Sequence, residues 1–416
     1  MEMVLEFLRD VLSQPALLIG IMSCIGLIAL KRPFHKVMTG TLKPILGYLM
    51  LAAGAGVIVN NLDPLGKMIE HGFHITGVVP NNEAIVAVAQ KVLGVETMSI
   101  LVVGLLMNLC IARFTKFKYV FLTGHHSLFM ACLMSAVLGT AGLSGMELIL
   151  VGGFLMGAWS AISPAIGQSY TSKVTDGDEI AIGHFGSLGY YLSAWVAKYV
   201  GKADDSTEDI EIPEKWGFLR DSTLSTALTM IVFYLIAAFA AGSEFVATLS
   251  GDMSPYLYAV MSAMNFAVGV TIVYSGVRMI LGDLIPAFQG IATKIIPNAI
   301  PAVDCAVFFT YAPTAVVLGF ISSFIGGIIG MLILGAVGGV LIIPGLVPHF
   351  FCGATAGIYG NATGGRRGAA VGAFLNGLAI TFLPALALPV LGQLGFQNTT
   401  FGAADFAVMG LVLGHT

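Results

Sequence analysis

Charged residues are scarce in this sequence. Only 10% of its 416 residues are Asp, Glu, Lys or Arg, whereas 57% are hydrophobic and the mean hydropathy is +0.90. Soluble globular domains carry about 25% charged residues, so this chain has too few to cover its apolar surface with a polar shell. The composition therefore excludes a water-soluble globular protein and predicts a polytopic membrane protein whose main solvent is the lipid bilayer.

Basic runs, paired cysteines and catalytic motifs are also missing. The formal charge is −4 and no Lys/Arg run exceeds two residues, so nucleic acid is not an expected partner. The five cysteines never have CxxC spacing and are expected to be buried free thiols. No Walker loop, HExxH, GxSxG or acidic metal-binding cluster is present, so we expect no cofactor, no metal and no ATP-driven pump.

Long apolar stretches recur along the chain instead. Measured against the roughly 20 residues that cross a bilayer, they predict an all-α polytopic membrane protein with about eleven transmembrane segments. The clear candidates are 12–30, 44–59, 99–113, 120–139, 148–166, 224–249, 256–280 and 319–340. Gly, Pro, Asp and His interrupt the apolar pieces in 169–200, 297–318 and 344–389, which predicts re-entrant hairpins and broken helices that line a cavity.

Basic residues in two short loops predict the orientation. They are Lys31, Arg32, Lys36 and Lys43 in one loop and Arg113, Lys116 and Lys118 in the other. Both loops should be cytoplasmic, which places the N-terminus outside, with the first apolar stretch kept as a helix. The acidic segment 201–222 then also lies in the cytoplasm, either as a solvated linker between two halves or as a docking surface for a soluble partner.

Three short motifs of the first half recur in the second half. Gly56-Val57, Leu62-Asp63-Pro64 and Val79-Pro80-Asn81 are echoed by Gly276-Val277, Leu284-Ile285-Pro286 and Ile296-Pro297-Asn298, at offsets of 217 to 222 residues. By the span count, the two copies leave the membrane on opposite sides, so the repeat is predicted to be inverted. Inverted repeats are typical of alternating-access carriers, whose binding site lies near the midplane at broken helices.

Ionisable residues inside apolar stretches are the candidate functional groups. His125 and His126 lie near the start of a predicted span, and His184 lies in a polar turn that re-enters an apolar run. Asp304 is the carboxylate most isolated in apolar surroundings. Such a carboxylate must be paired, protonated or solvated in a cavity, and the hydroxyls of a polyol would satisfy it.

Other groups have a structural interpretation beside the functional one. A histidine in a span is often an interhelical hydrogen-bond donor, and Glu96 and Thr97 could cap a helix or reach a cavity. The glycine-rich run from 353 to 365 could form a hairpin-like element whose backbone amides face a solute. We expect Tyr190 and Tyr191 to pack in the core or anchor the protein at the membrane interface.

Several longer motifs match one known family. They include Lys173-Val-Thr-Asp-Gly-Asp-Glu-Ile-Ala-Ile-Gly-His, Ser206-Thr-Glu-Asp-Ile-Glu-Ile-Pro, Ile296-Pro-Asn-Ala-Ile-Pro-Ala-Val-Asp-Cys-Ala and Tyr311-Ala-Pro-Thr-Ala-Val-Val-Leu-Gly-Phe. With shorter matches at 122–125, 276–279, 341–345 and 351–355, they cover nearly the whole chain. Together these motifs resemble the ascorbate-specific IIC component of the phosphotransferase system.

The resemblance implies a homodimer in the bacterial inner membrane. Each protomer would have a V-motif domain that dimerises (12–60 and 223–280), a core domain that holds the solute (80–200 and 297–416) and a cytoplasmic linker (201–222). The core would carry L-ascorbate inward by elevator-type alternating access. A separate IIB component would then phosphorylate the solute with the help of IIA, so this chain is expected to be a translocation subunit and not an enzyme.

The resemblance also assigns solute contacts. They are His125, His184, Asp304 and the turn Ala354-Thr355. The family pattern has glutamine where this chain has Phe129 and Phe185. Without these two amides, recognition would shift toward backbone and aromatic contacts.

Ascorbate is a monoanion at neutral pH, which helix N-termini and histidine donors could hold while Asp304 accepts hydroxyl protons. Because an ionised carboxylate would repel the anion, we expect Asp304 to face the neutral hydroxyl end or to be protonated. Two other functions remain open, a IIC component for another sugar acid or a polyol such as galactitol, and an ion-coupled carrier in which Asp304 binds a proton or sodium. A membrane-embedded His/Asp enzyme has the least support because no nucleophile is present.

Overall fold

The computed structural model describes residues 10–11, 14–74, 77–80, 82–177, 179–210, 222–392 and 399–414. The predicted span start at 12–13 and residues 211–221 of the predicted linker lie outside them. The longer helices are α2 (Pro15–Ala29), α3 (Phe34–Gly72), α4 (Asn82–Phe114), α5 (Gly124–Thr140), α6 (Gly145–Thr175), α7 (Ser187–Val200), α8 (Ser222–Ala241), α9 (Ser243–Ser250), α10 (Pro255–Lys294), α11 (Pro313–Ala336), α13 (Ala354–Gly392) and α14 (Ala404–Gly414). The short elements are α12 (Leu346–Pro348), the 3₁₀-helices η1 (Thr207–Asp209) and η3 (Cys305–Thr310), the π-helix η4 (His349–Gly353), and the strands β1 (Val79–Pro80), β2 (Tyr119–Phe121), β3 (Ala181–Ile182), β4 (Ile300–Val303) and β5 (Thr399–Thr400).

The helices have the length and composition of membrane spans, which confirms the predicted all-α polytopic class. Six helical segments of the described chain are long and apolar enough to cross a bilayer, and a bent pair at 226–250 would make a seventh. That pair bends by 117° at Gly242, whose φ of +83° favours glycine, so the segment predicted as a span over 224–249 is broken at this residue. The predicted total of about eleven spans stays a prediction.

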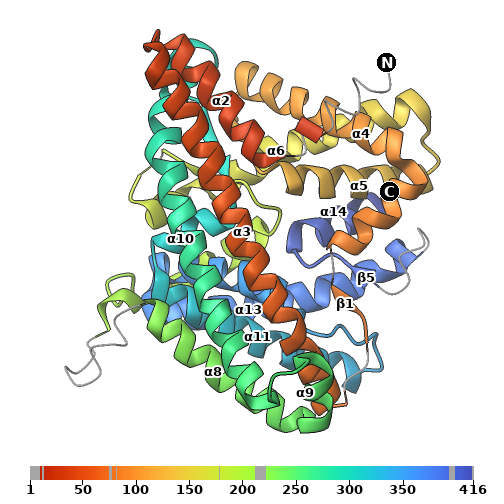
Figure 1. The fold of residues 1–416 in the computed structure, drawn as a ribbon. Coiled ribbons are helices and arrows are strands. Elements are labelled where there is room, and N and C mark those ends of the chain that lie inside the picture. Colours follow the sequence, from red (N-terminus) through yellow and green to blue (C-terminus); the bar gives the residue numbers. More distant parts are fainter. Residues whose placement is uncertain are drawn as a thin grey trace.

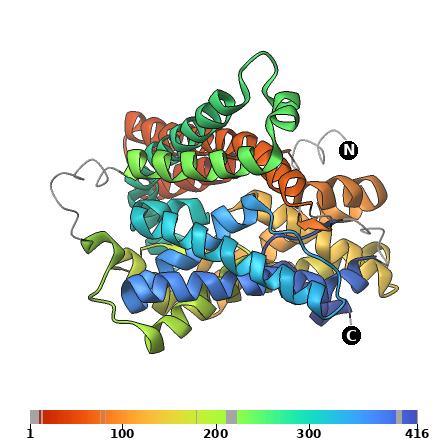
Figure 2. The same ribbon diagram turned by 90° about the horizontal axis from the view of Figure 1, so that it is seen from below.

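The helices form two bodies packed side by side (Figure 2). The scaffold bundle consists of α2, α3, α8, α9 and α10, with α3 and α10 in contact along most of their length (Figure 1). The site body consists of α4–α7, α11–α14 and the three-stranded sheet. The V-motif domain (12–60 and 223–280) and the core domain (80–200 and 297–416) stay predictions, and α3 and α10 continue to 72 and 294, beyond 60 and 280.

Glycine explains how closely α3 and α10 approach. A Cβ atom at Gly47 would lie 2.9 Å from the carbonyl oxygen of Gly276, and one at Gly54 would lie 2.7 Å from that of Gly269. The two helices therefore run antiparallel with their backbones in contact, which is how small residues pack helices in membranes.

The same glycines reveal the repeat. Gly47, Gly54 and Pro64 of α3 match Gly269, Gly276 and Pro286 of α10, all at an offset of 222 residues. Because the two helices are antiparallel, these matches support the predicted inverted repeat. They also correct its register, since Gly54 and not Gly56 is the counterpart of Gly276.

Two small parallel sheets join segments of both halves as well. In one sheet β4 lies between β2 and β3, and in the other β1 pairs with β5 while Val78 bridges to Ile342. The two sheets correspond strand by strand under the same repeat. The sequence did not predict these strands because two to four residues are too few to show an alternating pattern.

Candidate functional site

A cavity of about 1280 Å³ lies between the scaffold bundle and the site body. On the scaffold side its wall is α3 from Tyr48 to Glu70, the residue Phe73 just after that helix, and Phe233, Ile236 and Ala237 of α8. On the other side the wall includes His125, His126, Phe129, His184, Asp304, Cys305, Phe351 and Cys352. The four polar groups that the sequence singled out at membrane depth therefore meet at one cavity.

The three-stranded sheet brings these groups together. His125 and His126 follow β2, His184 follows β3 and Asp304 follows β4, and all three strands are parallel. The carboxyl ends of parallel strands lie at the same edge of a sheet, where polar loops form a binding crevice. A sheet of very few residues thus joins motifs that lie far apart in the sequence.

Asp304 is buried at this edge and bonded on both oxygens. Its Oδ1 accepts a hydrogen bond of 3.0 Å from the backbone N–H of Ala306 and so caps η3, while its Oδ2 lies 3.4 Å from His125 Nε2. The other nitrogen of His125, Nδ1, lies 3.3 Å from the hydroxyl of Tyr48 on α3. His125 therefore links the carboxylate to the scaffold bundle.

The buried rings of His126 and His184 are oriented by backbone amides. The N–H of Phe185 donates to His126 Nδ1 at 3.2 Å, and the N–H of Gly186 donates to His184 Nδ1 at 3.1 Å. The hydroxyl of Tyr190 also lies 2.8 Å from His184 Nδ1. Because Nδ1 accepts in both rings, each neutral imidazole carries its proton on Nε2 and is a hydrogen-bond donor there.

The histidine rings lie together on an aromatic support. The ring centroids of His126 and His184 are 3.8 Å apart, and Phe406 of α14 stacks on His126 at 5.6 Å. Phe129 lines the cavity with its ring centroid 5.8 Å from that of His125. Across the described ranges, no group of three or more His, Cys, Asp or Glu side chains has the arrangement of a metal site.

Phe185 was predicted to contact the solute, and its side chain is placed elsewhere. The ring is fully buried and stacks on Phe121 at 4.6 Å, so it packs inside the body and does not line the cavity. What reaches the site is its backbone N–H, which holds His126. The surroundings of this side chain are aromatic rings, so they suit phenylalanine better than the amide of glutamine.

Glu96, Thr97, Ala354 and Thr355 also lie outside the cavity lining. The Thr97 hydroxyl is 2.8 Å from that of Ser135 and joins α4 to α5. The Thr355 hydroxyl donates to the Phe351 carbonyl within its own helix at 2.7 Å, which is a common use of threonine in helices. Both hydroxyls therefore have structural bonds in this conformation.

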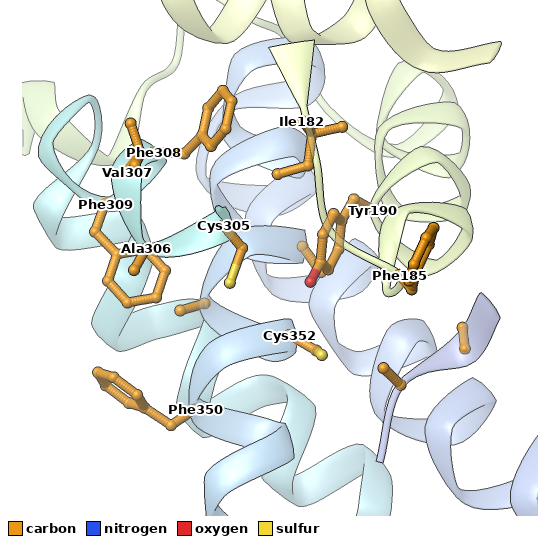
Figure 3. Packing of buried hydrophobic residues seen from close by; sticks show 14 of the residues in the cluster. Ile182, Phe185, Tyr190, Cys305, Ala306, Val307, Phe308, Phe309, Phe350 and Cys352 are labelled. Carbon is orange, nitrogen blue, oxygen red and sulfur yellow. The ribbon is translucent and has the colours of Figure 1, made fainter. Parts of the chain in front are cut away.

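Some site residues escaped the sequence analysis. They are Cys305 and Cys352, whereas His126 was among the candidate functional groups although the resemblance assigned only His125. Figure 3 shows Cys305, Cys352 and Tyr190 close together, contributed by η3, η4 and α7. Tyr190, predicted to pack, does so and also bonds His184.

Nearly the whole chain matches a family of transport proteins. The profile of the family described as "PTS system sugar-specific permease component" (EIIC-GAT) matches residues 10–405. The chain belongs to this family. This confirms the resemblance and identifies the chain as a phosphotransferase-system (PTS) sugar permease component, a transport unit.

A curated relative gives this permease a more specific comparison. The "Ascorbate-specific PTS system EIIC component" of Mycoplasma pneumoniae (strain ATCC 29342 / M129 / Subtype 1) is 28% identical over 417 residues. The match covers 86% of the permease and 62% of the relative, so the permease spans less than two thirds of the length of that protein.

Proposed function

We propose that this permease binds L-ascorbate in the cavity and carries it inward, where a separate IIB component phosphorylates it. The observation that carries the proposal is the pairing of two Nε2–H donors, from His126 and His184, with the carboxylate of Asp304 in one cavity. Ascorbate has both an anionic oxygen, which takes such donors, and hydroxyls, which a carboxylate accepts. The name of the M. pneumoniae relative supports the same solute.

The shape of the cavity favours an outward-facing state. The cavity follows α3 from Tyr48 to Glu70, away from the end of the helix that follows Lys31 and Arg32. If these basic residues are cytoplasmic, the cavity opens toward the outside of the cell. Elevator-type movement of the site body along the scaffold bundle of a bacterial inner-membrane homodimer would then carry the site inward.

The segment after α7 is anchored to the site body. Glu208 accepts hydrogen bonds from the backbone N–H groups of Thr314 and Ala315 at the start of α11, and Arg366 forms an ion pair with Asp205. Residues 201–210 would therefore move together with the site. For residues 201–210, this anchoring favours a docking surface for the soluble IIB and IIA partners over a freely solvated linker.

The test is uptake of labelled ascorbate into vesicles that contain the purified permease. We expect accumulation of the phosphorylated solute only when phosphorylated IIB is inside. Uptake driven by an ion gradient without IIB would instead support an ion-coupled carrier and overturn the proposal.

A binding panel identifies the solute. Ascorbate, galactitol and hexuronates are titrated against the same protein and against the Asp304→Asn variant. Tightest binding of galactitol or a hexuronate would retain the permease function but replace ascorbate as its solute.

A further inference from the structure

The turn between β3 and α7 carries both the cavity histidine His184 and the amides that orient the rings. Helix α7 begins at Ser187, and its N-cap residue is Gly186, which has no side chain to bond the first N–H groups of the helix. Such groups need partners when they are buried. The turn therefore depends on another part of the chain.

Asp405, on the first turn of α14, accepts from one of these N–H groups and from a hydroxyl at the start of α7. Its Oδ1 accepts a hydrogen bond of 2.9 Å from the backbone N–H of Leu188, and its Oδ2 accepts one of 2.8 Å from the hydroxyl of Ser187. Its own backbone N–H donates to the carbonyl of Phe185 at 3.1 Å. The side chain is fully buried, so this carboxylate caps α7 from a distant helix and its charge suits the helix N-terminus.

The residues that Asp405 fixes are those that orient the histidines. Asp405 holds the carbonyl of Phe185 and the start of α7, and between these points the N–H groups of Phe185 and Gly186 donate to the rings of His126 and His184. A shift of this turn would release both Nδ1 atoms from their donors. Each ring could then move its proton between Nδ1 and Nε2.

The inverted repeat explains why these residues meet. Helix α7 follows β3 as α14 follows β5, and Ser187 and Asp405 are counterparts at the offset of 218 residues that also relates the two strands. The equivalent turns of the two halves thus pack against each other. One copy carries the histidine, and the other supplies the carboxylate that holds it.

We propose that Asp405 is a positioning residue of the solute site: it fixes the turn 184–188 and thereby keeps His126 and His184 as Nε2–H donors. The inference rests on the proposed function for its effect on solute binding. The predicted tautomer of each ring does not depend on the proposed function, because it is a property of the protein without solute.

The first test compares solute affinity in two variants. Asp405→Ala removes both side-chain acceptors, and we expect ascorbate affinity to fall about tenfold or more. Asp405→Asn can still accept from Leu188 with its oxygen and bond Ser187 with its amide, so affinity should return to within about threefold of the parent protein. As a matched control, Thr171→Val breaks the buried bond to Tyr359 in the same body and should lower thermal stability without changing affinity.

The second test reads the rings directly. Histidine labelled with ¹⁵N distinguishes a protonated from an unprotonated ring nitrogen by NMR, and His126→Gln and His184→Gln variants assign the two signals. We expect both rings to be single Nε2–H tautomers in the parent protein and to become mixtures in Asp405→Ala. If Asp405→Ala does not fold, Ser187→Ala takes its place. This variant removes the hydrogen bond from the Ser187 hydroxyl to Asp405, and we expect a smaller shift toward mixed tautomers.

These readouts separate the possible failures. Unchanged tautomers, or Asp405→Asn as weak in binding as Asp405→Ala, would overturn the positioning role. If the parent protein binds no ascorbate while the tautomers change as expected, the proposed solute fails and the positioning role stands.

Discussion

The scaffold bundle and the site body differ most in their buried polar contacts. In the scaffold bundle, α3 and α10 touch backbone to backbone at Gly47 and Gly54, and the ion pair of Lys43 with Asp283, 3.8 Å apart, lies near one end of the contact. In the site body, buried histidine, tyrosine and aspartate side chains bond backbone amides from distant segments. Glycine contacts also pack helices in the site body, as at Gly319 and Gly357 between α11 and α13, but there the specific polar side chains are added to them.

This difference teaches what each body can tolerate. Lipid supplies no hydrophobic drive between helices, so a contact between them in the scaffold bundle depends on close packing, which one added side chain can destroy. A buried polar network instead depends on every donor having its acceptor, and losing one partner leaves another unsatisfied. Bulk should therefore break the scaffold, and changed polarity should break the site.

The largest expected effect is at the contact between the two long helices. In Gly54→Leu the new Cβ would lie 2.7 Å from the Gly269 carbonyl oxygen and 2.8 Å from the Val273 nitrogen, so the helices must separate. We expect a loss of more than about 4 kcal/mol in folding free energy and no monodisperse protein on size-exclusion chromatography.

The matched control lies two residues away on the same helix. A Cβ at Gly56 would meet no atom within 4 Å, so Gly56→Leu should keep the yield and melting temperature of the parent protein. Equal loss in both variants would show that α3 needs glycine for a reason other than contact with α10.

The sequence predicted those parts of the fold that depend on long apolar stretches and on their interruptions. The breaks predicted in 169–200, 297–318 and 344–389 are where β3, β4, η3 and η4 lie. It did not predict the strands, because they are too short to show a pattern. The strands are nevertheless what bring the site together.

The site was predictable where a residue is unusual in its local stretch. His125, His184 and Asp304 stand out as polar groups in apolar surroundings, and all three line the cavity. Asp405 escaped attention because its function depends on a turn more than 200 residues away. The side chain of Phe185 was misplaced because the sequence does not show which face of a turn is buried.

The next largest effect separates two phenylalanines within the site body. Phe185→Gln would bury an amide between Phe121 and Phe406, and we expect it to cost about 3 kcal/mol of folding free energy. Phe129→Gln faces the cavity, so it should cost less than about 1 kcal/mol and raise ascorbate affinity by adding hydrogen-bond partners. Thermal unfolding and solute titration of both variants measure this, and equal destabilisation would contradict the different placement of the two rings.

Asp304→Asn tests polarity with the shape preserved. The variant keeps an oxygen to cap η3 but loses the charge opposite His125 and one acceptor for the solute. We expect about 10- to 100-fold weaker ascorbate binding and little change in melting temperature. Asp63→Asn, exposed at the other end of the same cavity, is the control and should bind normally. Full or higher affinity in Asp304→Asn would refute a hydroxyl contact.

The smallest expected effect concerns a hydrogen-bonding contact between the two bodies. The hydroxyl of Tyr48 on α3 lies 3.3 Å from His125 Nδ1, and this contact must break if the site body moves along the scaffold. In Tyr48→Phe the ring still fills its buried place, so folding should be unchanged while the present conformation loses one hydrogen bond, about 0.5–1.5 kcal/mol. The ratio of the two conformations should therefore shift about 2- to 12-fold away from this one.

Spin labels at the exposed positions Leu49 and Val371, one on each body, measure that ratio as distance populations. Tyr234→Phe, which breaks a hydrogen bond to the Asn61 carbonyl within the scaffold bundle, should leave the ratio unchanged, and an equal shift in both variants would show that the contact between the bodies has no special role.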